Sequence, residues 1–274
     1  MFLMVWMMKD CRFRISEENE EEKNMKTIAI YNNKGGCGKT VTAVNMAYNL
    51  TAMGWRTLVI DMDPQGNASS FFRRYDLFRP SVMELLTGRL APSRCIYRTV
   101  YPMLDIIQAN IRLREVDVQS LIGGIRTLRS AGWVFENRYD YCIIDCPPSL
   151  DFLVEVIMDA ADDVIIPMKP DRFSSDGLGT VIDVIQEFCH GKVTAGCLFT
   201  QFYRNRDSIK TVNHVLNTQD IVVYDNVIRR CAAVDHSVLV RRPLARCASK
   251  SYAALDYMDF TREYLEREEK HGIA

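Results

Sequence analysis

Lys34-Gly35-Gly36-Cys37-Gly38-Lys39-Thr40 is a glycine-rich stretch that follows a short apolar segment, residues 27–31, rich in β-branched side chains. From Lys39 onward the apolar residues recur at helical spacing. A strand, a glycine-rich turn and a helix in this order form a phosphate-binding loop. The glycines let the backbone approach phosphate oxygens, and the first N–H groups of the helix point at them. The sequence therefore predicts a nucleotide-binding loop.

Two lysines and a threonine give this loop its predicted chemistry. Lys39 is expected to reach the β- and γ-phosphates of a nucleotide, and the Thr40 hydroxyl is expected to ligate Mg²⁺. Asn33 stands where the usual G-x4-G-K-[ST] pattern has its first glycine, and Lys34 is an additional lysine.

The pattern Lys-Gly-Gly-x-Gly-Lys-Thr resembles the deviant P-loop of the ParA/MinD class of ATPases. The resemblance implies that Lys34 crosses a dimer interface to the partner's nucleotide, and that Lys34 and Lys39 are catalytic. The nucleotide contacts predicted from it are Lys34, Gly35, Gly36, Cys37, Gly38, Lys39, Thr40 and Val41.

Two aspartates follow the next strand-like segment, residues 57–60, in the stretch Asp61-Met62-Asp63-Pro64-Gln65-Gly66-Asn67. Ligands of α/β sheets gather at the carboxyl ends of strands, and period-two spacing puts both carboxylates on one side. One carboxylate can meet the water shell of a metal while the other orients the attacking water. The stretch also resembles the switch I segment of ParA proteins, which implies that Asp63 positions the hydrolytic water and Asp61 supports the metal site.

A third apolar segment, residues 141–144, ends in Asp145 and continues Cys146-Pro147-Pro148. An apolar strand that ends in aspartate is typical of the residue that holds Mg²⁺, usually through water. The Asp-x-Pro-Pro sequence resembles switch II of the same family. We expect Cys142 and Cys146 to be small buried hydrophobes rather than catalytic thiols, because no histidine is near them in sequence.

Residues 204–250 carry nine Lys and Arg against four Asp, a local charge of +5. A basic surface without stacking aromatics suits salt-sensitive contact with a phosphate backbone. The resemblance to ParA proteins implies non-specific DNA binding by the ATP-bound dimer, although the segment before Pro243 departs from the family pattern. A solvated charged face is the alternative. The predicted DNA contacts are Arg229, Arg230, Arg241, Arg242 and Lys250.

The composition is that of an ordinary globular chain: 274 residues, 48% hydrophobic, 25% charged, with a net charge of −1. This balance excludes global steering toward nucleic acid, and nine cysteines without a C-x-x-C pair suggest a reducing cytosol. Residues 1–24 hold a short apolar run and then an acidic one, which indicates a disordered or mis-assigned leader. A membrane-touching or partner-docking arm is the alternative.

Alternating strand and helix patterns predict one doubly wound α/β domain over residues 25–274, a P-loop NTPase with a mostly parallel sheet. A helical pattern is expected through 113–128 and a terminal helix over 253–268, with Leu255, Phe260 and Tyr264 among its buried positions. Residues 256–274 have a net charge of −3, unlike a membrane-surface helix.

The resemblance implies an ATP- and Mg²⁺-dependent ATPase switch, slow and partner-stimulated, which closes as a nucleotide-sandwich homodimer. It also implies a cytoplasmic, nucleoid-associated protein that partitions a plasmid, chromosome or mobile element with a ParB-like partner and without a membrane. A MinD-like ATPase that positions proteins or membranes is the main alternative. A nitrogenase iron-protein-like reductase with Cys95 and Cys146 as ligands, a tyrosine autokinase and a DNA-binding protein with an inactive ATPase site are weaker alternatives.

Overall fold

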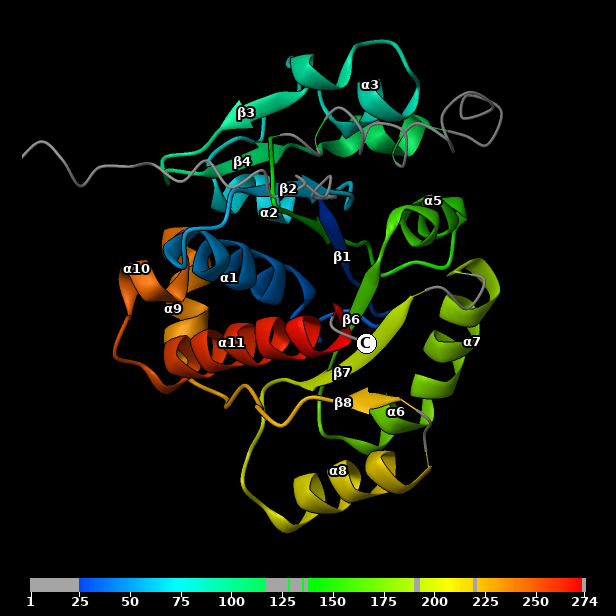
Figure 1. The fold of residues 1–274 in the computed structure, drawn as a ribbon, viewed down its shortest axis with the longest axis vertical. Helices are drawn as coiled ribbons and strands as arrows, with labels where there is room; N and C mark the ends of the chain where they lie inside the picture. Colours follow the sequence, from blue (N-terminus) through cyan, green and yellow to red (C-terminus); the bar gives the residue numbers. More distant parts are fainter. Residues whose placement is uncertain are drawn as a thin grey trace, which may run out of the picture.

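The computed structural model describes residues 25–116, 128, 135, 138–189, 193–218 and 221–272 (Figure 1). The predictions for residues 1–24, and most of the helical pattern expected through 113–128, lie outside the described residues. The start of that pattern is described and the prediction there is wrong. Leu113 lies in a 3-10 helix, Ile111–Glu115, and Val116 is extended (φ −76°, ψ 123°).

An eight-stranded sheet forms the centre of the molecule, in the order β3-β4-β2-β5-β1-β6-β7-β8. Every neighbouring pair is parallel except β3 and β4, which are antiparallel. The predicted doubly wound, mostly parallel α/β fold is therefore confirmed. The strands are β1 (Lys26–Ile30), β2 (Thr57–Asp61), β3 (Ile96–Arg98), β4 (Leu104–Ile107), β5 (Tyr141–Asp145), β6 (Asp163–Met168), β7 (Thr194–Phe199) and β8 (Val222–Val223).

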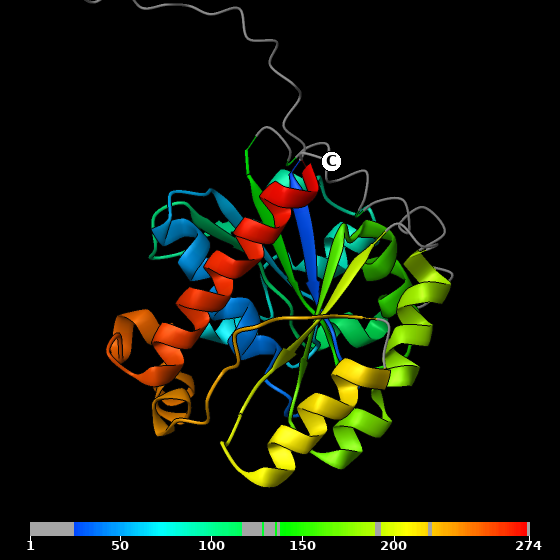
Figure 2. The same cartoon turned by 60° about the horizontal axis from the view of Figure 1, so that its bottom comes forward.

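Helices cover both faces of this sheet, as Figures 1 and 2 show. Successive residues of β1 point to opposite faces: Ile28 and Ile30 pack in the core with α1 and α11, whereas Ala29 and Tyr31 pack in the core with α5 and α7. The α-helices are α1 (Lys39–Ala52), α2 (Asn67–Phe71), α3 (Val82–Leu86), α5 (Phe152–Ala160), α6 (Arg172–Asp176), α7 (Leu178–Cys189), α8 (Arg206–Thr218), α9 (Ala232–Val240), α10 (Leu244–Cys247) and α11 (Tyr252–Gly272).

The terminal helix α11 lies against α1 with Tyr257, Phe260 and Tyr264 buried. The expectation for Leu255 is wrong, because this side chain is 49% exposed. Its neighbour Asp256 is buried instead and is paired with Arg229, so the buried face of α11 is partly polar. The helical spacing of apolar residues in the sequence could not reveal this polar part of the interface.

Strand register places the predicted site residues side by side. In β2 and β5, Asp61 is directly opposite Asp145, and in β1 and β5, Ile30 is directly opposite Asp145. The phosphate-binding loop leaves β1 immediately after Ile30. All three segments therefore meet at the carboxyl edge of neighbouring strands, where α/β sheets bind ligands.

Candidate nucleotide-binding site

The glycine-rich loop connects β1 to α1 in the predicted conformation. Gly36 and Gly38 have φ values of +68° and +98°, in the left-handed region that side-chain-bearing residues rarely adopt. Gly38 is the N-cap of α1, and its carbonyl oxygen accepts the first helical hydrogen bond from Thr42 N at 2.8 Å. The glycines are therefore required by the backbone geometry of the loop.

Hydrogen bonds to three loop carbonyls hold this conformation. Lys39 Nζ donates to the carbonyl of Lys34 at 2.8 Å. From the distant β7 end, Thr200 Oγ1 donates to the carbonyl of Cys37 at 2.6 Å, and Gln201 Nε2 donates to that of Gly36 at 2.8 Å. The loop is thus braced both by its own lysine and by residues about 160 positions later in the chain.

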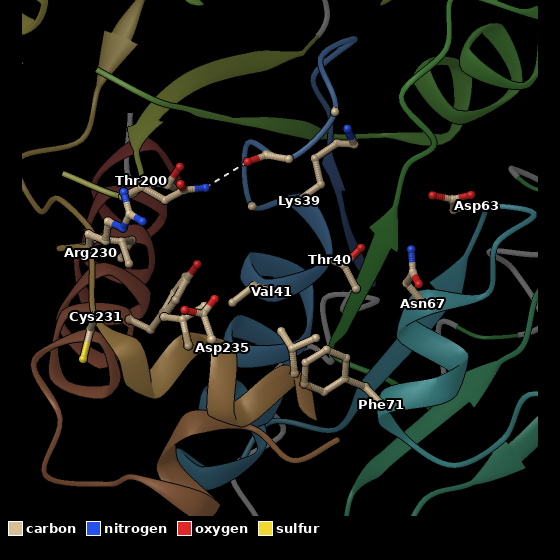
Figure 3. Close-up of a pocket in the computed structure, with 18 of the residues that line it drawn as sticks. Lys39, Thr40, Val41, Asp63, Asn67, Phe71, Thr200, Arg230, Cys231 and Asp235 are labelled. Atoms are coloured by element: carbon tan, nitrogen blue, oxygen red, sulfur yellow. Dashed lines mark hydrogen bonds between the residues drawn. The ribbon is translucent and has the colours of Figure 1, made fainter. Parts of the chain in front are cut away.

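A cavity of about 760 Å³ lies at the loop, within the size range of small-ligand sites (Figure 3). Lys34 and Cys37 are not among its lining residues, and the Cys37 side chain is only 2% exposed, so Cys37 can contribute only its backbone. The predicted residues that line it are Gly35, Gly36, Gly38, Lys39, Thr40, Val41 and Asp63.

Asp63 lies at the edge of this cavity, three residues before the left-handed Gly66 that begins α2. One carboxylate oxygen accepts a hydrogen bond from Gln65 N at 2.9 Å. This local turn holds the side chain in the wall of the cavity that Lys39 and Thr40 also line. The geometry is suited to orienting a water molecule beside a bound terminal phosphate.

Asp61 has a different environment from the one expected for a metal ligand. It is fully buried, and it accepts hydrogen bonds from Ser69 N at 2.8 Å, Ser69 Oγ at 2.7 Å and Asp63 N at 3.1 Å. Burial raises the pKa of Asp61 to about 6, against the lowering effect of these donors. The contacts favour a positioning role, in which Asp61 holds the Asp63 segment and α2 in place.

Asp145 is also fully buried, but neither of its carboxylate oxygens has a hydrogen-bond partner in the described part of the chain. Burial, followed by the nearby charge of Asp61, raises its pKa well above the ordinary value, while the Thr40 hydroxyl and the Lys39 ammonium act in the opposite direction. A buried carboxylate without partners is costly, and a divalent cation beside Thr40 would compensate it. The residues present therefore fit Mg²⁺.

No group of three or more His, Cys, Asp and Glu side chains in the described residues could hold a metal without other ligands. This agrees with Mg²⁺ held by one or two protein oxygens, with phosphates and water as the remaining ligands.

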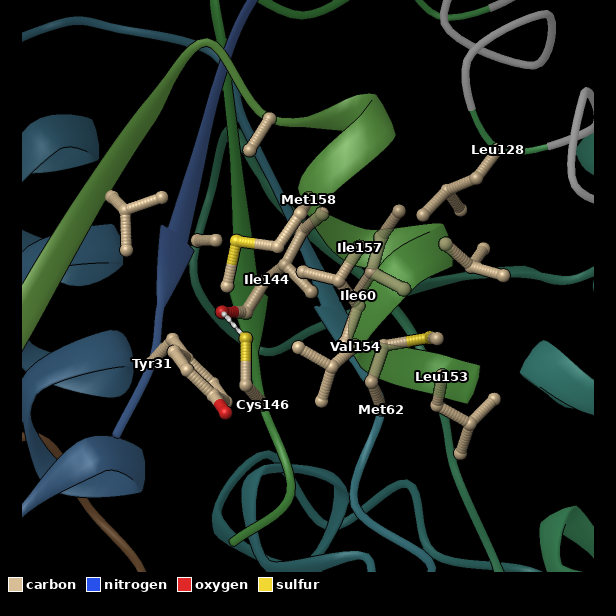
Figure 4. Close-up of a cluster of buried hydrophobic side chains, with 14 of the residues drawn as sticks. Tyr31, Ile60, Met62, Leu128, Ile144, Cys146, Leu153, Val154, Ile157 and Met158 are labelled. Atoms are coloured by element: carbon tan, nitrogen blue, oxygen red, sulfur yellow. Dashed lines mark hydrogen bonds between the residues drawn. The ribbon is translucent and has the colours of Figure 1, made fainter. Parts of the chain in front are cut away.

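The buried thiols confirm the prediction for Cys142 and Cys146, each 1% exposed. Figure 4 shows Cys146 among the apolar side chains of β5 and α5, where its Sγ donates to the carbonyl of Ile144 at 3.6 Å. Burial raises the pKa of Cys146 well above its usual value. Cys95 is fully buried as well, so neither Cys95 nor Cys146 is placed to ligate a cluster at an interface.

The far end of the cavity could not be derived from the sequence, because its residues come from α9, α11 and the segments before them. Arg230 lies with its guanidinium 5.2 Å from the centre of the Tyr203 ring, and Asp235 brings a carboxylate to the same wall. The residues that line this end are Gln201, Ile228, Arg229, Arg230, Cys231, Val234, Asp235, Val238, Arg241 and Tyr257.

Three of the five predicted DNA contacts, Arg229, Arg230 and Arg241, line the nucleotide cavity. Arg229 is bound to Asp256 through Nε at 3.0 Å and Nη2 at 2.5 Å, and its guanidinium lies 4.4 Å from the centre of the Tyr252 ring. Arg230 lines the nucleotide cavity, and Arg241 and Arg242 surround two further hollows beside α9 and α10. Lys250 is exposed and lines none of the three cavities. Their role in DNA binding stays a prediction.

Across the described residues, no helix has both the length and the apolar character that crossing a membrane requires.

Comparison with known proteins gives a consistent family. The family model described as "AAA domain" matches residues 25–194. The sporulation initiation inhibitor protein Soj of Bacillus subtilis is 31% identical over 247 residues, which are 87% of this chain and 97% of Soj. The chromosome partitioning protein ParA of Caulobacter vibrioides is 31% identical over 265 residues, covering 89% of this chain and 95% of that protein.

Among solved structures, cobyrinic acid a,c-diamide synthase from Mycobacterium smegmatis, with a bound ATP analog and magnesium, is 29% identical with a TM-score of 0.77. The match covers 90% of this chain and 97% of that one. The glycine-rich loop and the order of the strands agree with these matches. The chain belongs to the ParA/Soj family of P-loop ATPases.

Proposed function

We propose that this protein is an ATP-driven switch that binds DNA non-specifically as a nucleotide-sandwich homodimer and partitions a plasmid, chromosome or mobile element. The observation that carries the proposal is one cavity that joins Lys39 and Thr40 of the loop to Asp63, with Asp145 buried nearby and no hydrogen bond to its carboxylate among the described residues. The bound ATP analog and magnesium of the M. smegmatis structure support the choice of ligand.

Each residue has a distinct task in the proposed site. The loop amides and Lys39 bind the β- and γ-phosphates, and Thr40 with Asp145 would hold Mg²⁺, while Asp61 positions the switch segment. When bound, Mg²⁺ neutralises charge on the phosphates. Lys34 of one protomer stabilises the transferring phosphoryl group on its partner's nucleotide.

Asp63 orients the water that attacks. A bond forms from the water oxygen to the γ-phosphorus, and the bond to the β–γ bridging oxygen breaks. ADP leaves with the electron pair of that bond, and a proton of the water is carried away on the released phosphate. We infer that turnover is slow until a ParB-like partner completes the site, and that the protein is cytoplasmic and nucleoid-associated.

A MinD-like membrane cycle is less well supported. In that alternative the terminal helix would have to supply a membrane-binding face rich in Lys and Arg. Helix α11 instead buries Tyr257, Phe260 and Tyr264 against the domain, and its exposed charged residues are of both signs, namely Asp259, Arg262, Glu266, Glu269 and Lys270.

The test is binding of a mixed-sequence DNA duplex by fluorescence anisotropy, with ATP, ADP or no nucleotide, at 50 and 200 mM salt. We expect binding with ATP alone, weakened by roughly 10³-fold or more between the two salt concentrations if six or more phosphates are contacted. Asp63→Ala, which keeps the loop, should bind DNA with ATP, and Lys39→Ala should not. ATP-dependent dimerisation without DNA binding in any state would overturn the DNA-partitioning proposal.

A further inference from the structure

A cluster of four arginines surrounds two adjoining hollows on the side of the nucleotide cavity formed by α2, α9 and α10. The arginine cluster consists of Arg73, Arg241, Arg242 and Arg246. All four line both hollows, which have volumes of about 930 and about 600 Å³. Neither lining contains an Asp or a Glu. The site thus gathers positive charge from segments about 170 residues apart in the chain.

The charges in this cluster are not neutralised by the described protein. All four arginines are exposed, and no ion pair involves any of them within the described ranges. They also lie near one another: burial raises the pKa of Tyr101, which lines the smaller hollow, while the charges of Arg242, Arg246 and Arg73 act against that rise. Like charges held together repel, and an anion between them removes the repulsion.

The backbone holds two of these arginines in an uncommon conformation. Arg73 has φ 54° and Arg241 has φ 53°, in the left-handed region, and Met103 in the smaller hollow has φ 63°. Such residues are strained and are concentrated at ligand clamps and switch regions. The geometry therefore agrees with a binding site.

The arginine cluster shares walls with the nucleotide cavity. Ser70 of α2 and Arg241 at the end of α9 line both the nucleotide cavity and the larger hollow. Arg73 follows α2 by two residues, and α2 begins directly after the Asp63 loop.

Tyr75 makes a second connection. A Cβ placed on Gly66 would lie 2.3 Å from the Tyr75 ring, so the ring packs directly on the Gly66 backbone. Gly66 N in turn donates to the carbonyl of Asp63 at 2.8 Å, and Tyr75 lines the larger hollow. A shift of the Asp63 loop must therefore move the ring and the wall that carries Arg73.

We propose that the arginine cluster is a second anion site, which binds consecutive phosphates of a nucleic-acid backbone and is coupled to the nucleotide cavity through α2 and Tyr75. This inference rests on the proposed function for its choice of DNA as the polyanion. Each hollow is larger than a single phosphate, and a backbone presents consecutive phosphates to both. The coupling is reciprocal, so DNA bound at the cluster raises the affinity for ATP by the factor by which ATP raises the affinity for DNA.

The principal test compares Arg73→Asn/Arg246→Ala with Arg172→Ala, an exposed arginine on α6 at the far end of the sheet. Asparagine is chosen at position 73 because it tolerates a left-handed backbone. With ATP and a mixed-sequence duplex, the double variant should lose about 10-fold or more in affinity, and the slope of log K against log salt should fall by about 1 to 2. The DNA binding of the control should be unchanged.

A second pair of variants tests the coupling. Tyr75→Ala should reduce the ratio of DNA affinities with ATP and with ADP, whereas Tyr75→Phe keeps the ring on Gly66 and should retain that ratio. ATP affinity measured with and without the duplex should change by the same factor in each variant.

The outcomes separate the two proposals. If the wild-type protein binds DNA with ATP but the double variant binds equally, with the same salt slope, the arginine cluster is not the site and the proposed function stands. If the wild-type protein binds DNA in no state, both proposals fail. If anionic phosphatidylserine vesicles bind through the cluster and the duplex does not, the choice of nucleic acid is wrong.

Discussion

Ser69 donates two hydrogen bonds to the buried carboxylate of Asp61, from its backbone N at 2.8 Å and from its Oγ at 2.7 Å. The same Oγ accepts a hydrogen bond from Ala109 N at 2.9 Å. This arrangement ties α2 to the ends of β2 and β4. The Asp63 loop between Asp61 and Ser69 is therefore held at both ends.

Ser69→Ala should destabilise the protein by about 1–3 kcal/mol, because it removes one of the donors to the buried Asp61 carboxylate and leaves Ala109 N without its acceptor. The midpoint of urea unfolding measures this change. Ser70→Ala is the matched control, since Ser70 lies at cavity walls without a side-chain hydrogen bond in the described contacts. Equal midpoints for the two variants would contradict the role assigned to Ser69.

Asp145→Asn should stabilise the ligand-free protein and abolish its stabilisation by Mg²⁺ and ADP. The folded-state pKa of Asp145 lies above its unfolded value, so the wild-type protein loses stability as the pH rises from about 4 through the folded pKa. The advantage of the variant should therefore be small near pH 4.5 and grow to about 1–3 kcal/mol near pH 8. Urea unfolding at both pH values measures it, and an advantage that shrinks with rising pH would sink this account.

Lys34→Ala should bind ATP as a monomer with near-normal affinity but lose ATP-dependent dimerisation and at least 100-fold in hydrolysis rate, a typical cost of removing a charge that stabilises the transition state. Lys34 does not line the protomer's own nucleotide cavity, which is consistent with a role on the partner's nucleotide. Sedimentation with ATP and a phosphate-release assay provide the readouts. Normal dimerisation and hydrolysis by the variant would refute the crossing lysine.

Arg229→Ala should destabilise the fold by about 1–3 kcal/mol, because it removes the partner of Asp256, whose side chain is 9% exposed. This loss of stability is smaller than for a fully buried pair, because the Arg229 side chain is 46% exposed to solvent. Arg230→Ala, which breaks no ion pair in the described residues, should change stability by less than about 0.5 kcal/mol. Thermal unfolding of both variants checks the difference, and loss of DNA binding in Arg229→Ala has to be judged against it.

The amino-acid sequence is sufficient to predict the phosphate-binding loop, Asp63 just after β2 and Asp145 at the end of β5. These features depend on consecutive residues: left-handed backbone at Gly36 and Gly38, a helix that begins at Lys39, and apolar strands that end in a carboxylate. Local sterics and hydrogen bonding specify such structures, so a short stretch of sequence is sufficient to predict them.

The other parts of the site depend on contacts between segments that are distant in the sequence. The sequence position of Asp61 is the same whether it supports a metal or positions α2, and only the structure reveals its hydrogen bonds with Ser69. The basic residues after 204 look alike in sequence, yet Arg229 is paired with Asp256, whereas Arg241 joins Arg73 at a separate cavity. These differences arise from how helices pack on the sheet, which brings together residues distant in sequence, and neither charge counts nor hydrophobic periodicity contains that information.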